Sequence, residues 1–170
     1  MRFQTALKQG FEIVKLNRAA MQHVSTIPEA FTQALIITAL AGVASLLTPH
    51  GFTPLGWMWN NPIAAVIKLF IFSAILHFMA TVLGHQGDFM ALFRVLGLGR
   101  VLGVVLIVPF IGGVVNGIWG LVIAVIALEE LYQMERMKAV LCLIAPIIAF
   151  GIISAISGIM NLVFLGSMCF

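Results

Sequence analysis

The chain has 170 residues, of which 62% are hydrophobic and 9% are charged. Because a soluble domain carries about 25% charged residues, this chain has too little polar surface to face water on all sides. Its length gives room for one domain, so we expect an all-α integral membrane protein without a separate soluble catalytic domain.

The basic residues follow a pattern that predicts how the chain crosses the membrane. Of the nine Lys and Arg residues, all except Lys68 fall in three clusters that alternate with stretches free of Lys and Arg. Cytoplasmic loops of membrane proteins carry an excess of basic residues. We therefore place the clusters in the cytoplasm, together with the N-terminus. The clusters are Arg2, Lys8, Lys15 and Arg18; Arg94 and Arg100; and Arg136 and Lys138.

The first segment, residues 3–15, predicts an amphipathic helix. At about 100° per residue, Phe11 and Ile13 lie on one apolar arc, and Lys8 and Glu12 lie opposite. A helix of this kind lies in the membrane interface rather than across the bilayer. The alternative is that the helix packs on a partner protein.

Local start signals precede the first two predicted membrane spans. Thr26-Ile-Pro-Glu29 has the spacing of a capping box, and we place the start of the first span after it. Asn61-Pro62 is an N-cap followed by proline at the first helical position, which predicts the start of the second span.

The apolar run from residue 89 to residue 131 is ambiguous. Its uncharged core, residues 101–128, would reach roughly 42 Å as one helix, against a hydrocarbon core of about 30 Å. Pro109 and Gly112-Gly113 mark a turn within it. One span would also place Arg136 outside, whereas two spans keep it in the cytoplasm.

We therefore predict five transmembrane helices and a C-terminus outside the cytoplasm, which is the periplasm for a bacterial inner membrane. Residues 1–26 form the cytoplasmic amphipathic segment, and residues 27–170 form the transmembrane domain. The spans are expected at about residues 31–48, 63–83, 91–108, 114–131 and 139–163.

Two charged residues are expected to pair inside the membrane. Arg100 lies near the middle of the third span, where a charge is costly. If the chain turns at Gly112-Gly113, the side chains of Arg100 and Glu129 lean toward each other, which predicts an ion pair. Glu130 is the alternative partner. Arg100 could instead snorkel to the head groups, or bind an anionic lipid or a substrate.

Lys68 and His77 are the other polar candidates within a span. Lys68 lies near the outer end of the second span and is expected to snorkel outward. His77 lies about 180° away on the same helix, and we expect it to hydrogen bond to a neighbouring helix. An axial ligand for haem or chlorophyll is the alternative role for His77. No cofactor and no metal site is predicted.

Small residues spaced four apart predict faces through which helices pack closely. The pairs are Gly99 and Gly103, Gly113 and Gly117, and Gly151 and Ala155.

Catalytic motifs are missing from the sequence. It has no H-E-x-x-H, G-x-S-x-G or Walker motif and a single aspartate. We therefore expect a protein that is not an enzyme.

Several short motifs between residues 93 and 156 resemble the Yip family, the five-span proteins named for interaction with Ypt/Rab GTPases, and more closely its bacterial branch. The resemblance implies five helices, a cytoplasmic N-terminus and a C-terminus on the other side, and it brings no catalytic residues. GTPase binding is not carried over, because the longer cytoplasmic region that eukaryotic members use is essentially missing. The motifs are Phe93-Arg-Val-Leu-Gly97, Pro109-Phe-Ile-Gly-Gly113, Gly117-Ile-Trp-Gly-Leu-Val and Ala127-Leu-Glu-Glu130.

The expected function is to organise or scaffold other membrane proteins or lipids. The expected partners are membrane lipids and membrane proteins, with a homo-oligomer as a further option and no nucleic acid. One alternative is an accessory subunit of a large respiratory or photosynthetic complex. Another is a small oligomeric transporter with a polar path through Arg100, Glu129, Lys68 and His77, against which stands the lack of an inverted repeat.

Overall fold

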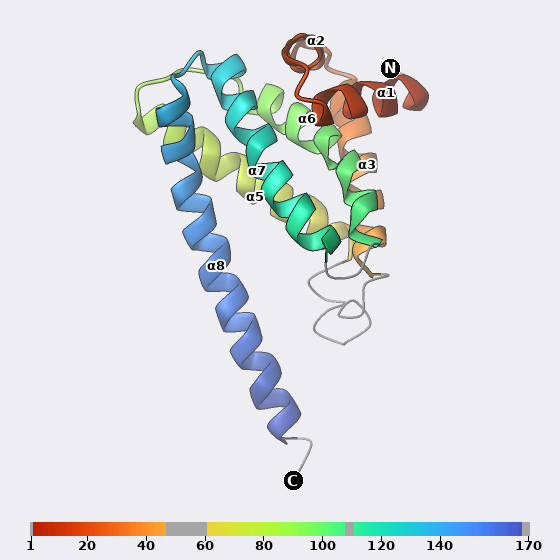
Figure 1. The fold of residues 1–170 in the computed structure, drawn as a ribbon, viewed down its shortest axis with the longest axis vertical. Coiled ribbons are helices and arrows are strands. Elements are labelled where there is room, and N and C mark those ends of the chain that lie inside the picture. Colours follow the sequence, from red (N-terminus) through yellow and green to blue (C-terminus); the bar gives the residue numbers. More distant parts are fainter. Residues whose placement is uncertain (1, 47–60, 108–110, 168–170) are drawn as a thin grey trace.

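The computed structural model describes residues 2–46, 61–107 and 111–167, and every regular element in these ranges is a helix (Figure 1). In chain order the helices are α1 (Phe3–Val14), α2 (Arg18–Thr26), α3 (Ala30–Leu46), α5 (Pro62–Val82), α6 (Phe89–Gly99), the 3₁₀ helix η1 (Arg100–Ile107), α7 (Ile111–Tyr132) and α8 (Arg136–Ser167).

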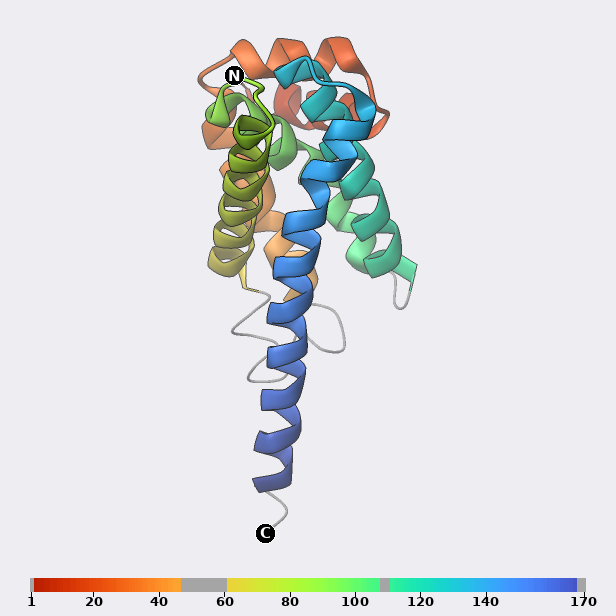
Figure 2. The ribbon, with the colours of Figure 1, turned by 90° about the vertical axis from the view of Figure 1, so that its left-hand side faces the viewer.

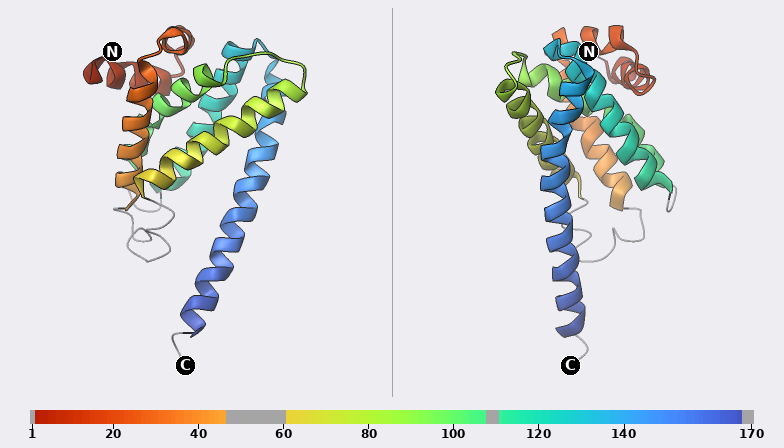
Figure 3. Two further views of the ribbon diagram at one scale, coloured as in Figure 1. Left: turned by 180° about the vertical axis from the view of Figure 1, so that it is seen from behind. Right: turned by 60° about the vertical axis from the view of Figure 1, so that its left-hand side comes forward.

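The helices form a bundle that is covered at one end. Helices α1 and α2 lie across the end where the connections from α5 to α6 and from α7 to α8 also lie, and we call this the capped end (Figures 1 and 2). Helix α8 packs on α5 and α7 near the capped end. Its other half extends past the ends of α3, α5 and α7 in every view (Figure 3).

Two helices in the described ranges, Pro62–Val82 and Gly113–Tyr132, are long and apolar enough to cross a membrane. The number is three if α2 and α3, between which the chain bends by 116°, count as one bent span. The predicted number of five spans therefore stays a prediction.

Helix α6 is the centre of the bundle, with α1, α2, α3, α5 and α7 packed around it. Its side chains are buried on nearly every side, and Phe93 and Leu98 are among the largest fully buried ones. A helix that is apolar all round belongs inside a bundle rather than at its surface.

Glycines let α6 and η1 lie directly against α3. A Cβ atom at Gly97 would come within 2.6 Å of Ala34 Cβ, and a Cβ at Gly103 would come within 2.6 Å of Ala41 Cβ. Any larger residue would force the two helices apart, which is the close backbone approach that small residues permit between membrane helices.

The run from residue 89 to residue 131 does divide into two antiparallel arms, with α6 and η1 running away from the capped end and α7 returning to it (Figure 1). The predicted turn motif falls partly on residues 108–110, which lie outside the described ranges. The first arm differs from the single α-helix expected over 91–108, because it changes to a 3₁₀ helix at Arg100.

Helix α1 confirms the predicted amphipathic helix, but its apolar side chains divide between two directions. Ala6, Gly10 and Ile13 are buried, and a Cβ at Gly10 would come within 2.6 Å of Val101 Cγ2. Phe11 points away and is 55% exposed. The amphipathic helix thus packs on its own bundle along one stripe.

Both helix starts lie where they were predicted, at Ala30 and Pro62, but only the second start has the predicted cap. Asn61 caps α5 by accepting a hydrogen bond from Ala64 N at 2.8 Å, and Pro62 is the first helical residue. Thr26 instead ends α2, where its hydroxyl donates to the His23 carbonyl at 2.9 Å. Thr26 is the last residue of α2, a second N-terminal helix that the sequence did not predict. Its hydroxyl is therefore bonded within α2 and does not cap α3.

Candidate functional site

Two groups of charged residues stand out, one at the capped end and one inside the bundle. The first joins α2 to α7 and α8. Arg18 Nη2 donates to Glu129 Oε2 at 2.6 Å, and Arg18 Nη1 donates to Glu130. Arg136 Nε donates to the other oxygen of Glu129 at 2.7 Å. We call Arg18, Gln22, Glu129, Glu130 and Arg136 the charge cluster; Gln22 Nε2 donates to Glu130 Oε2 at 2.8 Å.

The carboxylates of the charge cluster are sheltered, whereas the guanidinium groups are not. The side chain of Glu129 is 9% exposed, and that of Arg18 is 47% exposed. Hydrogen bonds between two charged groups are stronger than neutral ones, and a sheltered carboxylate that lost its partners would be left unpaired. The bond to Glu129 raises the pKa of the Arg136 guanidinium above its ordinary value. The cluster is therefore a set of charged hydrogen bonds that joins α2 to α7 and α8.

Two further hydrogen bonds fix the N-terminal helices to the bundle. Trp119 Nε1 on α7 donates to the Val14 carbonyl at 2.8 Å, and Arg94 Nη1 on α6 donates to the Ser25 carbonyl at 2.5 Å. Both carbonyls belong to the last turn of a helix, where backbone acceptors have no partner within the helix. Side chains of the bundle thus satisfy the C-terminal ends of α1 and α2.

The link between α1 and α2 is built locally. Leu16 adopts a positive φ of 64°, which reverses the chain, and Asn17 then caps α2 by accepting hydrogen bonds from Ala19 N and Ala20 N. Hydrogen bonds from Lys15 and Asn17 hold the pKa of the Glu12 carboxyl below its ordinary value. The two N-terminal helices therefore form one unit rather than a loose segment.

The structure does not bring Arg100 and Glu129 together as an ion pair. Among the ion pairs of the described residues, Glu129 pairs with Arg18 and Arg136. Glu129 lies at the capped end, within reach of arginines from α2 and α8, and these satisfy both of its oxygens. Glu130, the alternative partner for Arg100, is likewise bound to Arg18.

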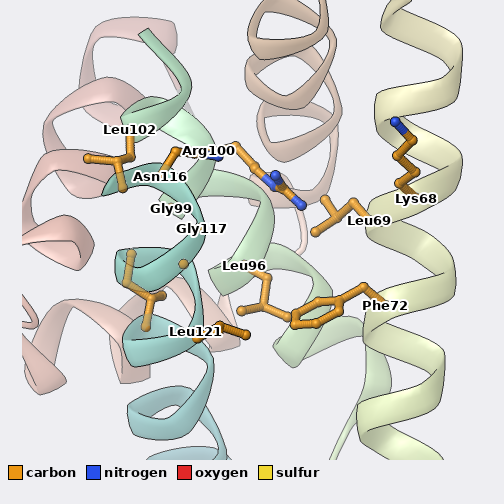
Figure 4. Close-up of a pocket in the computed structure, with 12 residues that line it drawn as sticks. Lys68, Leu69, Phe72, Leu96, Gly99, Arg100, Leu102, Asn116, Gly117 and Leu121 are labelled. Atoms are coloured by element: carbon orange, nitrogen blue, oxygen red, sulfur yellow. The ribbon is translucent and has the colours of Figure 1, made fainter. Parts of the chain in front are cut away.

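Arg100 instead lines a pocket inside the bundle. The pocket has a volume of about 250 Å³ and lies between α5, the junction of α6 with η1, and α7. Arg100 extends across it toward α5, the helix that carries Lys68 and Leu69, while Asn116 lies on α7 (Figure 4). Two of the sequence-predicted polar residues, Arg100 and Lys68, thus share one site.

His77 lies within hydrogen-bond distance of a neighbouring helix, as expected from the sequence. Its Nδ1 lies 2.6 Å from the hydroxyl of Tyr132, the last residue of α7. The Tyr132 ring also fills the space beside Gly87, where a Cβ would come within 2.6 Å of the ring. His77 therefore joins α5 to the end of α7 at the capped end.

The predicted small-residue pairs have different surroundings. Gly103 lies against α3, as described above, and Gly99 lies beside Ile13 and Ile123 at an ordinary contact distance of 3.5 Å for a Cβ. A Cβ at Gly113, Gly117 or Gly151 would meet nothing within 4 Å. Ala155 is exposed.

The part of the chain that the structure describes contains no group of three or more His, Cys, Asp or Glu residues that could hold a metal ion.

Sequence reasoning missed the pairing of Arg18 with Glu129 and Glu130, which are 111 and 112 residues away. A signal was present for Arg136 but not for Arg18, because two adjacent carboxylates at the end of an apolar helix need cations and Arg136 follows Glu129 by only seven residues. The pocket had no such local signal.

Comparison with known proteins gives the same family as the sequence motifs. The family described as the Yip1 domain matches residues 11–158, which include α2 to α7 and most of α8. No curated protein and no solved structure matches the chain significantly. The apolar helices and the family match together make it an integral membrane protein. Since the match covers most of the chain, this protein belongs to the Yip1-domain family.

Proposed function

We propose that this protein is a non-enzymatic, five-span membrane protein that organises other membrane proteins or lipids. The Yip1-domain family is not known as a family of enzymes, and the sequence has none of the hydrolase or nucleotide-binding motifs named above. A scaffold needs surfaces for partners rather than reacting groups.

The proposed location is a bacterial inner membrane, with the capped end in the cytoplasm and the C-terminus in the periplasm. Members of all three basic clusters meet at the capped end, which supports this orientation. Arg18 and Arg136 share Glu129, and Arg94 is bonded to Ser25 of α2. Basic residues collected at one end of a membrane bundle favour the cytoplasmic side for that end.

The observation that carries the proposal is the half of α8 that extends beyond the bundle. Gly151 at the midpoint of α8 and Ala155 one turn further on are both exposed, and a Cβ at Gly151 would meet nothing within 4 Å. Ile148 and Ile152 are more than half exposed. Membrane helices associate through small residues that let their backbones approach, so this half of α8 suits a helix of another membrane protein.

The test is purification of the full chain in a gentle detergent, followed by mass spectrometry of what accompanies it. Several partners at substoichiometric amounts would support the organising role, and replacing Gly151 by Leu should deplete them. Ile152→Leu is the matched control, because it keeps the volume and polarity of the same half of α8. Equal recovery of partners with Gly151→Leu and wild type would contradict the role given to this surface.

The same experiment separates the alternatives. One stoichiometric partner would favour an accessory subunit of a large respiratory or photosynthetic complex. A homo-oligomer that carries a solute across liposomes would favour a transporter. Two contacts argue against the transporter alternative. Glu129 is bound by arginines and His77 by Tyr132, so neither residue extends a polar path from Lys68 and Arg100.

A further inference from the structure

The pocket between α5, η1 and α7 carries positive charge within an apolar setting. Arg100 and Lys68 both line it, Asn116 adds an amide, and no acidic residue is among the described residues that form its wall. The remaining wall is mostly apolar, with Leu96 and Leu121 among its residues. Two cations of like sign in one pocket repel each other, and a membrane interior raises the cost of each.

The two carboxylates that the sequence offered as partners for Arg100 are bound elsewhere in the chain. Glu129 and Glu130 are bound at the capped end by Arg18 and Arg136. No ion pair of Arg100 is found among the described residues. A charge held among apolar side chains is normally paired or bound to a ligand, so the half-buried charge of Arg100 calls for an anion from outside the chain.

Glycines provide the space that such an anion needs. Gly99, Gly117 and Gly120 line the pocket, and a Cβ at Gly117 or Gly120 would meet nothing within 4 Å. The α7 side of the pocket is therefore open because two of its residues lack side chains. A bulky residue at either position would occupy the same space as a ligand.

We propose that this pocket binds a phosphate anion, either as the head group of an anionic lipid or as free phosphate. A guanidinium group matches phosphate oxygens with two parallel hydrogen bonds, and an ammonium group and an amide can supply more. The volume of about 250 Å³ lies just below the range of about 300–1,000 Å³ for small-molecule sites, which suits a head group and not a whole lipid. The inference does not depend on the proposed organising role.

The test uses the purified full chain in a neutral detergent, with native mass spectrometry and thermal unfolding as readouts. Phosphatidylglycerol, phosphatidylcholine and inorganic phosphate are added separately. We expect phosphatidylglycerol, inorganic phosphate or both to bind at one per chain and to raise the unfolding temperature, and we expect phosphatidylcholine to do neither. Binding of phosphatidylglycerol alone identifies a lipid source, and binding of inorganic phosphate as well identifies a site for the anion itself.

Variants decide whether the binding occurs in the pocket. Arg100→Met and Lys68→Met should each weaken binding about tenfold or more, because each removes a charged hydrogen-bond donor. Gly120→Leu should weaken it as strongly by filling the pocket without changing charge. The controls are Lys8→Met, which removes an exposed cation from α1, and Gly113→Leu, which adds the same side chain to α7 outside the pocket.

Two results would overturn the proposal. One is wild-type protein that binds neither anion in preference to phosphatidylcholine. The other is unchanged binding by Gly120→Leu together with Lys68→Met, a pair that decides the matter even if Arg100→Met does not fold. Neither result would bear on partners recovered through α8, so the two proposals fail separately.

Discussion

The charge cluster and the pocket hold arginines in opposite circumstances. At the capped end, Arg18 and Arg136 share the oxygens of Glu129. In the pocket, Arg100 lies beside another cation, Lys68, and no acidic residue is among the described residues of the wall. The comparison teaches that residue type does not separate a structural arginine from a binding arginine. What separates them is whether the chain itself supplies the counter-charge.

The largest expected effect comes from reversing the charge of Arg18. Arg18→Glu would place a third carboxylate beside Glu129 and Glu130, and like charges at this distance repel. We expect α1 and α2 to detach, with the unfolding temperature in detergent lowered by roughly 5 °C or more and proteolysis of residues 1–26 accelerated about tenfold or more. Lys8→Glu, an equal charge change on the exposed side of α1, is the control. Equal unfolding temperatures and proteolysis rates of the two variants would show that the charge cluster does not hold α1 and α2 on the bundle.

Removing the charge of Arg100 from the pocket should not lower the unfolding temperature. Arg100→Met removes a charge that the described chain does not pair, and replacing buried charges by apolar residues of similar size is often neutral or stabilising. In neutral detergent without added anion, we expect an unfolding temperature that is unchanged or raised by about 2–4 °C. Arg18→Met, measured alongside, should be destabilised. If Arg100→Met lowered the unfolding temperature as much as Arg18→Met, the distinction between the two regions would be removed.

A smaller effect is expected from the hydrogen bond between Trp119 and the Val14 carbonyl. Trp119→Phe keeps an aromatic ring and loses the donor, which should cost about 1 kcal/mol. The measurement is again thermal unfolding together with proteolysis of α1. Phe11→Leu changes an exposed aromatic residue of the same helix and should leave both unchanged in detergent. If only Phe11→Leu had an effect, α1 would be held by its outer face.

The smallest effect should come from Gln22, a neutral member of the charge cluster. Gln22→Ala removes one hydrogen bond to Glu130 at an exposed position, so we expect a loss below about 1 kcal/mol. Thermal unfolding with Arg18→Glu in the same series gives the scale. An effect of Gln22→Ala equal to that of Arg18→Glu would mean that hydrogen-bond geometry, and not charge, holds α2 in place.

Local features of the fold were predictable from the sequence. The second span was expected at about 63–83, and α5 covers Pro62–Val82, because Asn61 and Pro62 form a start signal that acts over one turn. Residues 3–15 predicted α1 by the spacing of their apolar side chains. The choice of a hydrogen bond for His77 also agrees with the structure, since its Tyr132 partner lies on a neighbouring helix.

Features that depend on distant parts of the chain were not predictable. The sequence placed Arg18 in a cytoplasmic basic cluster, and nothing near it in the chain indicated Glu129 and Glu130 as its partners. The pocket needs the relative placement of three helices, so Arg100 and Lys68 could be recognised as costly residues but not as neighbours. The predicted ion pair of Arg100 with Glu129 is absent for the same reason, because two arginines from other helices bind both oxygens of Glu129.

The 3₁₀ helix has a consequence for the length of the first arm of the α6–α7 pair. A 3₁₀ helix rises about 2.0 Å per residue, whereas an α-helix rises about 1.5 Å. The 11 residues of α6 and the 8 residues of η1 therefore extend roughly 32 Å together, against roughly 28 Å for the same residues in α-helical form. A hydrocarbon core is about 30 Å thick. The 3₁₀ half therefore brings the arm from slightly below that thickness to slightly above it.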